Sequence, residues 1–129
     1  MDSVNHERGT RSKITIWQQN VNKSQTGQHD IISSGKLAYV GIDIVALQEP
    51  AINFLGKTIA TRDWVPLYPS THKKALGETR SIMLINAAIP TESWEQVDFP
   101  SGDVTVLRVL GNGGKMTIFN ICIGPTAER

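Results

Sequence analysis

The segment that most constrains the fold is an apolar stretch, residues 42–49, which stops at Pro50. Proline has no amide hydrogen for a strand ladder, so the stretch reads as a short buried strand that ends there. Residues 13–20 alternate in polarity and predict an earlier strand, and apolar side chains recur at helical spacing over about 25–40. Strand, helix and strand in this order predict a βαβ unit with a right-handed crossover and two parallel strands.

The second half of the chain is a series of short apolar segments separated by turn residues. After a candidate short helix at 52–60, the expected strands are 64–68, 80–86, 94–97, 104–110 and 115–123. The sequences Pro100-Ser101-Gly102-Asp103 and Gly111-Asn112-Gly113-Gly114 lie where hairpin loops are needed, so the last strands should form an antiparallel meander. Their apolar residues fall on both faces, which indicates a second layer that this chain supplies poorly or not at all.

Length and charge then limit the class of protein. The 129 residues suit one domain, with polar residues 1–12 as a disordered arm and 13–129 as the folded part. A net charge of +1 gives no overall field that would attract nucleic acid or an anionic membrane, so such a role needs a local site. The single cysteine, Cys122, excludes an internal disulfide and a Cys-rich zinc site, and no stretch is apolar enough to span a membrane.

The strongest candidate site combines Asn20, at the end of the first strand, with Glu49, at the end of the second. Carboxyl ends of parallel strands meet at one edge of a sheet, where ligands commonly bind. Mg²⁺ prefers oxygen ligands and is held by one or two carboxylates together with water and phosphate oxygens. Glu49 would anchor the ion, while Asn20 would offer an amide oxygen or hold a phosphate. The alternative is structural: Asn20 caps a turn and Glu49 is a solvated charge.

Several segments resemble the endonuclease/exonuclease/phosphatase superfamily, in particular the endonuclease domain of fungal non-LTR retrotransposons. They occur in the family's order over about residues 13–126, and they are 14–24, 28–30, 44–50, 79–86 and 115–122. The resemblance implies an α/β fold, a four-layer sandwich of two face-to-face sheets flanked by helices, of which this chain would form the amino-terminal half. It also implies Mg²⁺-dependent phosphodiester hydrolysis that nicks DNA, with Asn20 and Glu49 as catalytic and metal-binding residues, and a nuclear location.

The chain departs from the family pattern at several positions. It contains no Asp-x-Asn motif and no Asp-His pair, and Cys122 stands where the family often has a tyrosine. His6, His29 and His72 have the wrong context for a catalytic base. We therefore expect a truncated endonuclease domain that is inactive alone and that needs a carboxyl-terminal half or self-associates. The alternative is a non-catalytic remnant that binds nucleic acid or protein.

The basic residues and tryptophans considered next have structural explanations as their first interpretation. We expect solvated surface positions for Lys23, Lys73, Lys74 and Arg80. The three tryptophans, Trp17, Trp64 and Trp94, are expected in the core or packed on a sheet rather than as platforms for bases.

Overall fold

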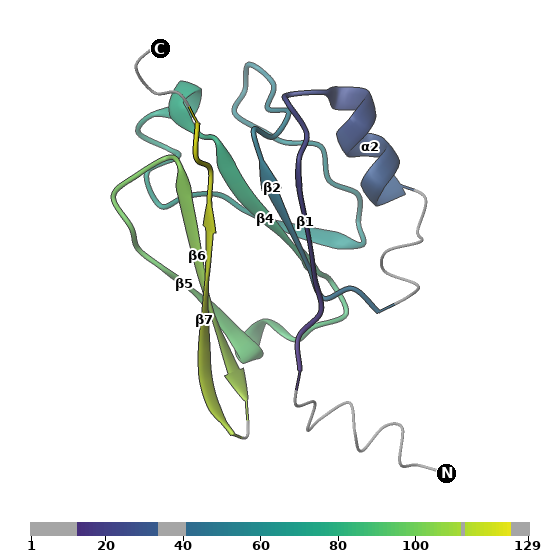
Figure 1. Cartoon of the computed structure of the whole chain (residues 1–129), viewed down its shortest axis with the longest axis vertical. Helices are drawn as coiled ribbons and strands as arrows, with labels where there is room; N and C mark the ends of the chain where they lie inside the picture. Colours follow the sequence, from purple (N-terminus) through teal and green to yellow (C-terminus); the bar gives the residue numbers. More distant parts are fainter. Residues whose placement is uncertain (1–12, 34–40, 112, 125–129) are drawn as a thin grey trace.

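Two β-sheets face each other in the computed structural model, which describes residues 13–33, 41–111 and 113–124 (Figure 1). The first sheet has the order β1-β2-β4-β3 and the second the order β5-β6-β7. The strands are β1 (Ile16–Asn20), β2 (Ile44–Gln48), β3 (Trp64–Leu67), β4 (Ser81–Asn86), β5 (Trp94–Val97), β6 (Val104–Gly111) and β7 (Gly114–Ile121). One α-helix, α2 (Gln25–Ser33), and two short 3₁₀ turns, Leu76–Glu78 and Thr91–Ser93, complete the described elements.

The βαβ unit at the start of the chain is confirmed. β1 and β2 are parallel and in register from Ile16 opposite Ile44 to Asn20 opposite Gln48. α2 begins after Ser24, whose hydroxyl accepts a hydrogen bond from the amide of Gly27 at 2.9 Å. The helix packs on one face of the first sheet, where a core cluster contains Val21, Ile32, Ile42, Val45, Leu47, Trp64, Ile82 and Leu84.

A second apolar cluster lies between the two sheets. Side chains alternate along a strand, so β2 and β4 direct every second residue away from α2 and towards the other sheet. The buried members of this cluster are Ile44, Ala46, Leu67, Met83, Ile85 and Leu107. The chain is thus an α/β protein with helix, sheet and sheet layers, which is part of the expected four-layer sandwich.

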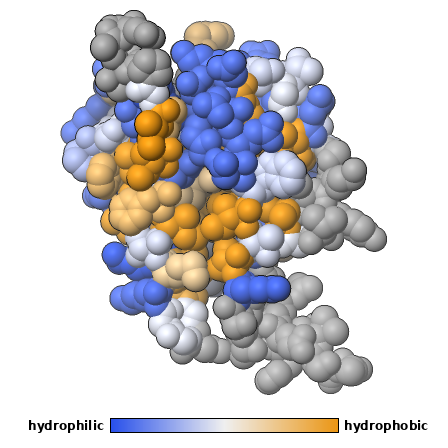
Figure 2. All heavy atoms as spheres, in the orientation of Figure 1, coloured by the Kyte–Doolittle hydropathy of each residue, from blue (hydrophilic) through white to orange (hydrophobic). Residues whose placement is uncertain are grey.

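The expected antiparallel meander is also confirmed, and its outward face carries exposed apolar residues. β6 pairs with both β5 and β7, while β7 has no strand on its other side among the described residues. Phe119 and Ile121 on β7 are each about half exposed. Figure 2 shows apolar surface along β7 and around the lower part of β1, and hydrophilic surface around the upper end of β1. No helix in the described ranges is long and apolar enough to cross a membrane.

Two expectations about secondary structure and the core were wrong. Residues 52–60 form no helix; Ile52 and Thr58 instead face each other in an antiparallel bridge around a tight turn. Trp17 is not a core residue: its side chain is 42% exposed on the edge strand β1, although Trp64 is buried and Trp94 half-buried. The expected arm, residues 1–12, and the end of the expected helix, residues 34–40, lie outside the described residues.

Candidate metal and phosphate site

The ends of five strands or their flanking turns are joined at one end of the molecule, the upper end in Figure 1. Main-chain hydrogen bonds connect Val21 N to Gln48 O (3.0 Å), Lys23 N to Glu49 O (2.7 Å), Glu49 N to Arg80 O (2.8 Å), Arg80 N to Gly102 O (2.8 Å) and Cys122 N to Asp103 O (2.8 Å). These bonds run from the first sheet to the second. Both sheets therefore contribute to the surroundings of Glu49.

Glu49 has a strained backbone. Its φ is 52°, in the left-handed region that non-glycine residues rarely adopt, and the following proline restricts it further. Such a conformation costs on the order of 1–3 kcal/mol and persists only where the surrounding structure enforces it. The two main-chain bonds of Glu49, to Lys23 and Arg80, provide that enforcement and hold the half-buried residue at the sheet edge.

Asn20 lies beside Gln48 in the parallel register, one residue from Glu49. Its Oδ1 accepts a hydrogen bond from the amide of Asn22 at 2.9 Å, and Asn22 and Lys23 both have left-handed backbones (φ 55° and 63°). Asn20 therefore does cap a turn, as the structural alternative proposed. An amide oxygen has two lone pairs, so this bond leaves one lone pair for a ligand. Glu49 is half-buried, so it differs from the solvated charge that the same alternative proposed.

Arg80 is not the solvated surface cation that we expected from the sequence. Its side chain is only 13% exposed, and its Nε donates a hydrogen bond to Oδ1 of Asp103 at 2.9 Å. This hydrogen bond raises the pKa of Arg80, burial opposes the increase, and the nearby charges of Asp103 and Glu49 add to it. Nη2 is buried without a hydrogen-bond partner among the described residues.

A glycine permits this ion pair. A β-carbon at Gly102 would collide with the carbonyl oxygen of Glu78, because the turn before β6 presses against the segment that leads into β4. This close contact also lets the carbonyl of Gly102 accept a hydrogen bond from the amide of Arg80. Asp103 thus does lie in the expected hairpin turn, but the turn also brings its carboxylate to Arg80.

Cys122 is a buried thiol, as we expected. Burial raises its pKa, the charge of Arg80 lowers it, and the charges of Glu49 and Asp103 raise it again. The thiol is therefore protonated at neutral pH and a poor nucleophile. We call Glu49, Arg80, Asp103 and Cys122 the Glu49 cluster; with the thiol neutral, its two carboxylates and one guanidinium leave an excess of one negative charge.

A layer of polar side chains, three of them buried and Gln48 half-buried, lies directly beneath this cluster, and sequence reasoning missed it. We call its members, Gln48, Ser81, Thr105 and Asn120, the inter-sheet network. Asn120 Nδ2 donates to the carbonyls of Leu47 (3.0 Å) and Ile82 (2.8 Å), and its Oδ1 accepts from Gln48 Nε2 (2.6 Å). The hydroxyl of Ser81 donates to the carbonyl of Asn120 at 2.7 Å, and that of Thr105 to the carbonyl of Ser81 at 2.8 Å.

The two described histidines have other hydrogen-bond partners. His72 is buried, with Nδ1 2.6 Å from the hydroxyl of Thr79 and Nε2 2.7 Å from the carbonyl of Gly56. Because a carbonyl only accepts, Nε2 carries the proton and Nδ1 accepts from Thr79. His29 Nδ1 is 3.2 Å from the Ser33 hydroxyl on the exposed side of α2. Neither residue is a candidate base at Glu49.

The donor set at this edge fits a hydrated Mg²⁺ ion. Glu49 supplies a carboxylate and Asn20 an amide oxygen, and Mg²⁺ keeps several waters when only one or two carboxylates bind it. Within the described residues no group of three or more His, Cys, Asp or Glu side chains could hold a metal. The arrangement thus suits an ion that completes its coordination with water and phosphate oxygens.

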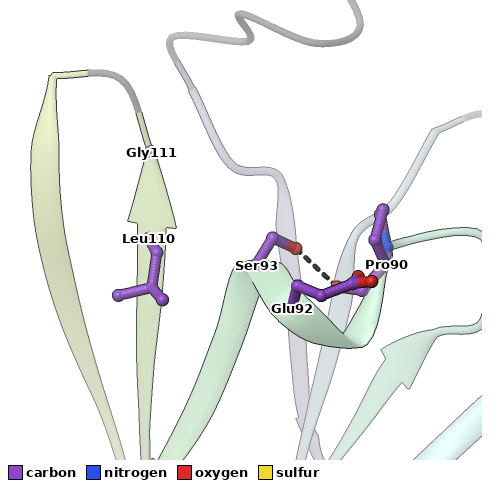
Figure 3. Close-up of a pocket in the computed structure, with 5 residues that line it drawn as sticks. All are labelled: Pro90, Glu92, Ser93, Leu110 and Gly111. Carbon is purple, nitrogen blue, oxygen red and sulfur yellow. Dashed lines mark hydrogen bonds between the residues drawn. The ribbon is translucent and has the colours of Figure 1, made fainter.

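A separate open hollow of about 320 Å³ lies at the other end of β6 (Figure 3). Leu110 and Gly111 face the turn that contains Pro90, Glu92 and Ser93, and the Ser93 hydroxyl donates to the Pro90 carbonyl at 2.6 Å. Asp103 precedes the opposite end of this strand. Glu92 is the only charged residue in the lining. The hollow therefore lacks the combination of carboxylate and cationic groups that the Glu49 cluster has.

Comparison with known proteins gives a fold and no family. No protein-family model matches the sequence, and no curated protein matches it. Among solved structures, the endonuclease domain of TRAS1, a telomere-specific non-LTR retrotransposon, is similar with a TM-score of 0.58 and 13% sequence identity. The similarity covers 88% of this chain and 46% of that one, so this chain spans just under half the length of the TRAS1 domain. The described elements therefore have the fold of part of a retrotransposon endonuclease domain.

Proposed function

We propose that this chain forms the metal- and phosphate-holding part of an Mg²⁺-dependent phosphodiesterase site that acts on DNA in the nucleus, as the family resemblance implies. The observation that carries the proposal is the strained, half-buried Glu49 beside Asn20 at the carboxyl ends of two parallel strands. The fold of the TRAS1 endonuclease domain supports it.

Each residue of the site has a distinct task in this proposal. Glu49 holds Mg²⁺ through its carboxylate, and Asn20 adds an amide oxygen without adding negative charge. When bound, the ion stabilises the charge that develops on the phosphate as it is attacked. Asp103 fixes the guanidinium of Arg80 close to Glu49, where its positive charge also favours a phosphate.

Glu49 offers the direct test of this site. Glu49→Gln removes the charge and keeps the shape of the side chain. We expect Mn²⁺ affinity, measured by electron paramagnetic resonance, to fall by at least about 10-fold. This is the smallest loss usual when a residue that supports a metal ligand is replaced, and Glu49 is proposed as a ligand itself. Glu92→Gln, at an exposed position in the 3₁₀ turn that faces the far end of β6, is the matched control and should bind Mn²⁺ as the wild type does. Equal Mn²⁺ affinity in the wild type and Glu49→Gln would contradict the proposed site.

Self-association of the isolated chain belongs to the same proposal. β7 has an unpaired edge within the described residues, and Phe119 and Ile121 expose apolar surface beside it. We expect the sedimentation coefficient to rise with concentration, and the double variant Phe119→Thr/Ile121→Thr to sediment closer to the monomer. A wild-type chain that sediments as a monomer and unfolds in one cooperative thermal transition would refute this expectation.

A further inference from the structure

We propose that the loop at residues 53–57 is a preorganised wedge that stacks against a base of the nucleic acid held at the Glu49 cluster. The inference rests on the proposed function and adds a contact residue to it. Phe54 at the tip of this Phe54 loop is 92% exposed, and Leu55 beside it is 64% exposed. Single exposed apolar residues are common on protein surfaces, but two adjacent ones at the tip of a rigid loop call for a partner.

The loop is held in one conformation by its own hydrogen bonds. Asn53 Oδ1 accepts from the amides of Leu55 (2.9 Å) and Lys57 (3.0 Å). The main chain adds Asn53 N to Lys57 O and Gly56 N to Asn53 O, both at 2.9 Å. Gly56 has φ +81°, and a β-carbon there would meet the side chain of Leu76. The loop therefore presents Phe54 with little conformational entropy left to lose on binding.

Buried residues fix the base of the loop to the rest of the protein. Nε2 of His72 donates to the carbonyl of Gly56 at 2.7 Å. The hydroxyl of Thr58 accepts a hydrogen bond from Gln28 Nε2 (2.7 Å), and the amide of Thr58 donates one to the Tyr68 hydroxyl (2.9 Å). The ring of His72 stacks on Tyr68 with centroids 4.2 Å apart. His72, which no catalytic role uses, thus serves to hold the Phe54 loop in place.

The position and the charge of the loop indicate a nucleic-acid strand as the partner. Phe54 follows Glu49 by five residues, so the two lie within about 18 Å even if the chain between them is fully extended. Lys57, Lys73 and Lys74 are exposed, and the His72–Gly56 hydrogen bond brings the segment carrying Lys73 and Lys74 to the loop. An aromatic tip flanked by cations matches a strand whose phosphates meet the lysines and whose base stacks on the ring.

The test compares binding of a 12-nucleotide single-stranded DNA that contains 2-aminopurine, using the 129-residue chain in Mg²⁺ buffer at several salt concentrations. Phe54→Ser should weaken binding by about 5- to 150-fold, the range for loss of one stacked base, and should abolish the change in 2-aminopurine fluorescence. It should leave the salt dependence unchanged. Lys57→Gln should instead reduce the slope of log affinity against log salt by about 0.7.

Phe119→Ser is the matched control, since Phe119 is a half-exposed phenylalanine on the outward face of β7. Measured below the concentration at which the wild type self-associates, it should bind the oligonucleotide as the wild type does. Because Phe54 is 92% exposed, Phe54→Ser should keep the wild-type melting temperature. Equal binding by wild type and Phe54→Ser overturns the wedge and leaves the proposed function standing. Equal losses in Phe54→Ser and Phe119→Ser also overturn it, as general apolar adsorption.

Two further results overturn the wedge for other reasons. If Phe54→Ser loses binding to phosphatidylserine vesicles but keeps its affinity for the oligonucleotide, the loop contacts a membrane surface. If the wild type binds no oligonucleotide at low salt, the proposed function falls together with the wedge.

Discussion

Replacing Asn120 with leucine is expected to lower the free energy of unfolding by about 3–5 kcal/mol, although the two side chains are similar in size. The substitution leaves the carbonyls of Leu47 and Ile82 and the Nε2 of Gln48 without the partner they have now. Each buried polar group that loses its partner costs about 1–3 kcal/mol, and Asn120 itself is buried. The sum places this variant among the most destabilising single changes available in the chain.

Urea denaturation followed by circular dichroism measures this effect. Thr117→Ala is a suitable control, because Thr117 is exposed on the same strand and should change the free energy of unfolding by about 0.5 kcal/mol or less. A loss below about 1 kcal/mol in Asn120→Leu would show that water or a rearranged Gln48 satisfies the abandoned groups. The inter-sheet network would then be incidental to the fold.

The network matters for the site because each of its members lies within two residues of a member of the Glu49 cluster. Gln48 precedes Glu49, Ser81 follows Arg80, Thr105 lies two residues after Asp103, and Asn120 lies two residues before Cys122. A shift of one sheet against the other would break the hydrogen bonds of Asn120. The buried layer thus fixes the separation of the charged groups above it.

The local sequence pattern predicted the elements whose polarity pattern and bounding turn residues agree. Residues 42–49 are apolar and stop at Pro50, and the structure has β2 at Ile44–Gln48, buried between α2 and the second sheet. Turn residues likewise placed the meander, and β5 spans the expected residues, Trp94–Val97. In these segments, strand propensity, the polarity pattern and the turn residues all favour the same structure, so a single sequence is sufficient to predict the element.

The errors arose where distant residues decide the structure. Residues 52–60 contain apolar side chains at spacings compatible with a helix, but the bonds from Gln28, Tyr68 and His72 select a turn instead. Trp17 was expected to be buried because it is large and apolar, yet it lies on an edge strand that is exposed along its whole length. Neither outcome is encoded in a local window.

Only part of the candidate site was predicted from the sequence. Asn20 and Glu49 were identified because strand ends of a βαβ unit must meet at one edge, and the parallel register of β1 and β2 is confirmed. Arg80 comes from the second half of the chain and reaches Glu49 through the pairing of β4 with β2. Asp103 and Asn120 belong to the second sheet and reach the site through packing of the two sheets. The one signal for Asn120 was a polar residue between the apolar residues Phe119 and Ile121, where an unpaired amide would be costly if buried.

The largest expected effect concerns catalysis: the purified chain should show no Mg²⁺-dependent nicking of supercoiled plasmid above background. Binding a metal and a phosphate stabilises charge, but hydrolysis also needs a base that removes a proton from the attacking water. General acid–base help of this kind is worth about 10²- to 10⁴-fold. In the Glu49 cluster the other ionisable groups are Arg80, Asp103 and Cys122, and none is suited to that task. The Asp103 carboxylate already accepts a hydrogen bond from Arg80 Nε at 2.9 Å. Arg80 is a cation whose pKa is raised, and the Cys122 thiol is protonated.

Plasmid relaxation on agarose gels gives the measurement, with a complete endonuclease domain of the same fold as the positive control. Nicking by the wild-type chain that Glu49→Ala abolishes would show that a base has been overlooked. Asp103 would then be the first group to replace, since it faces Arg80 within the cluster, whereas Asp43 lies at the opposite end of β2 with Oδ2 bound to the amide of Thr15 at 2.8 Å. If Asp103→Asn retained the nicking, the base would have to come from a second copy of the chain, and the specific activity would rise with protein concentration as copies associate.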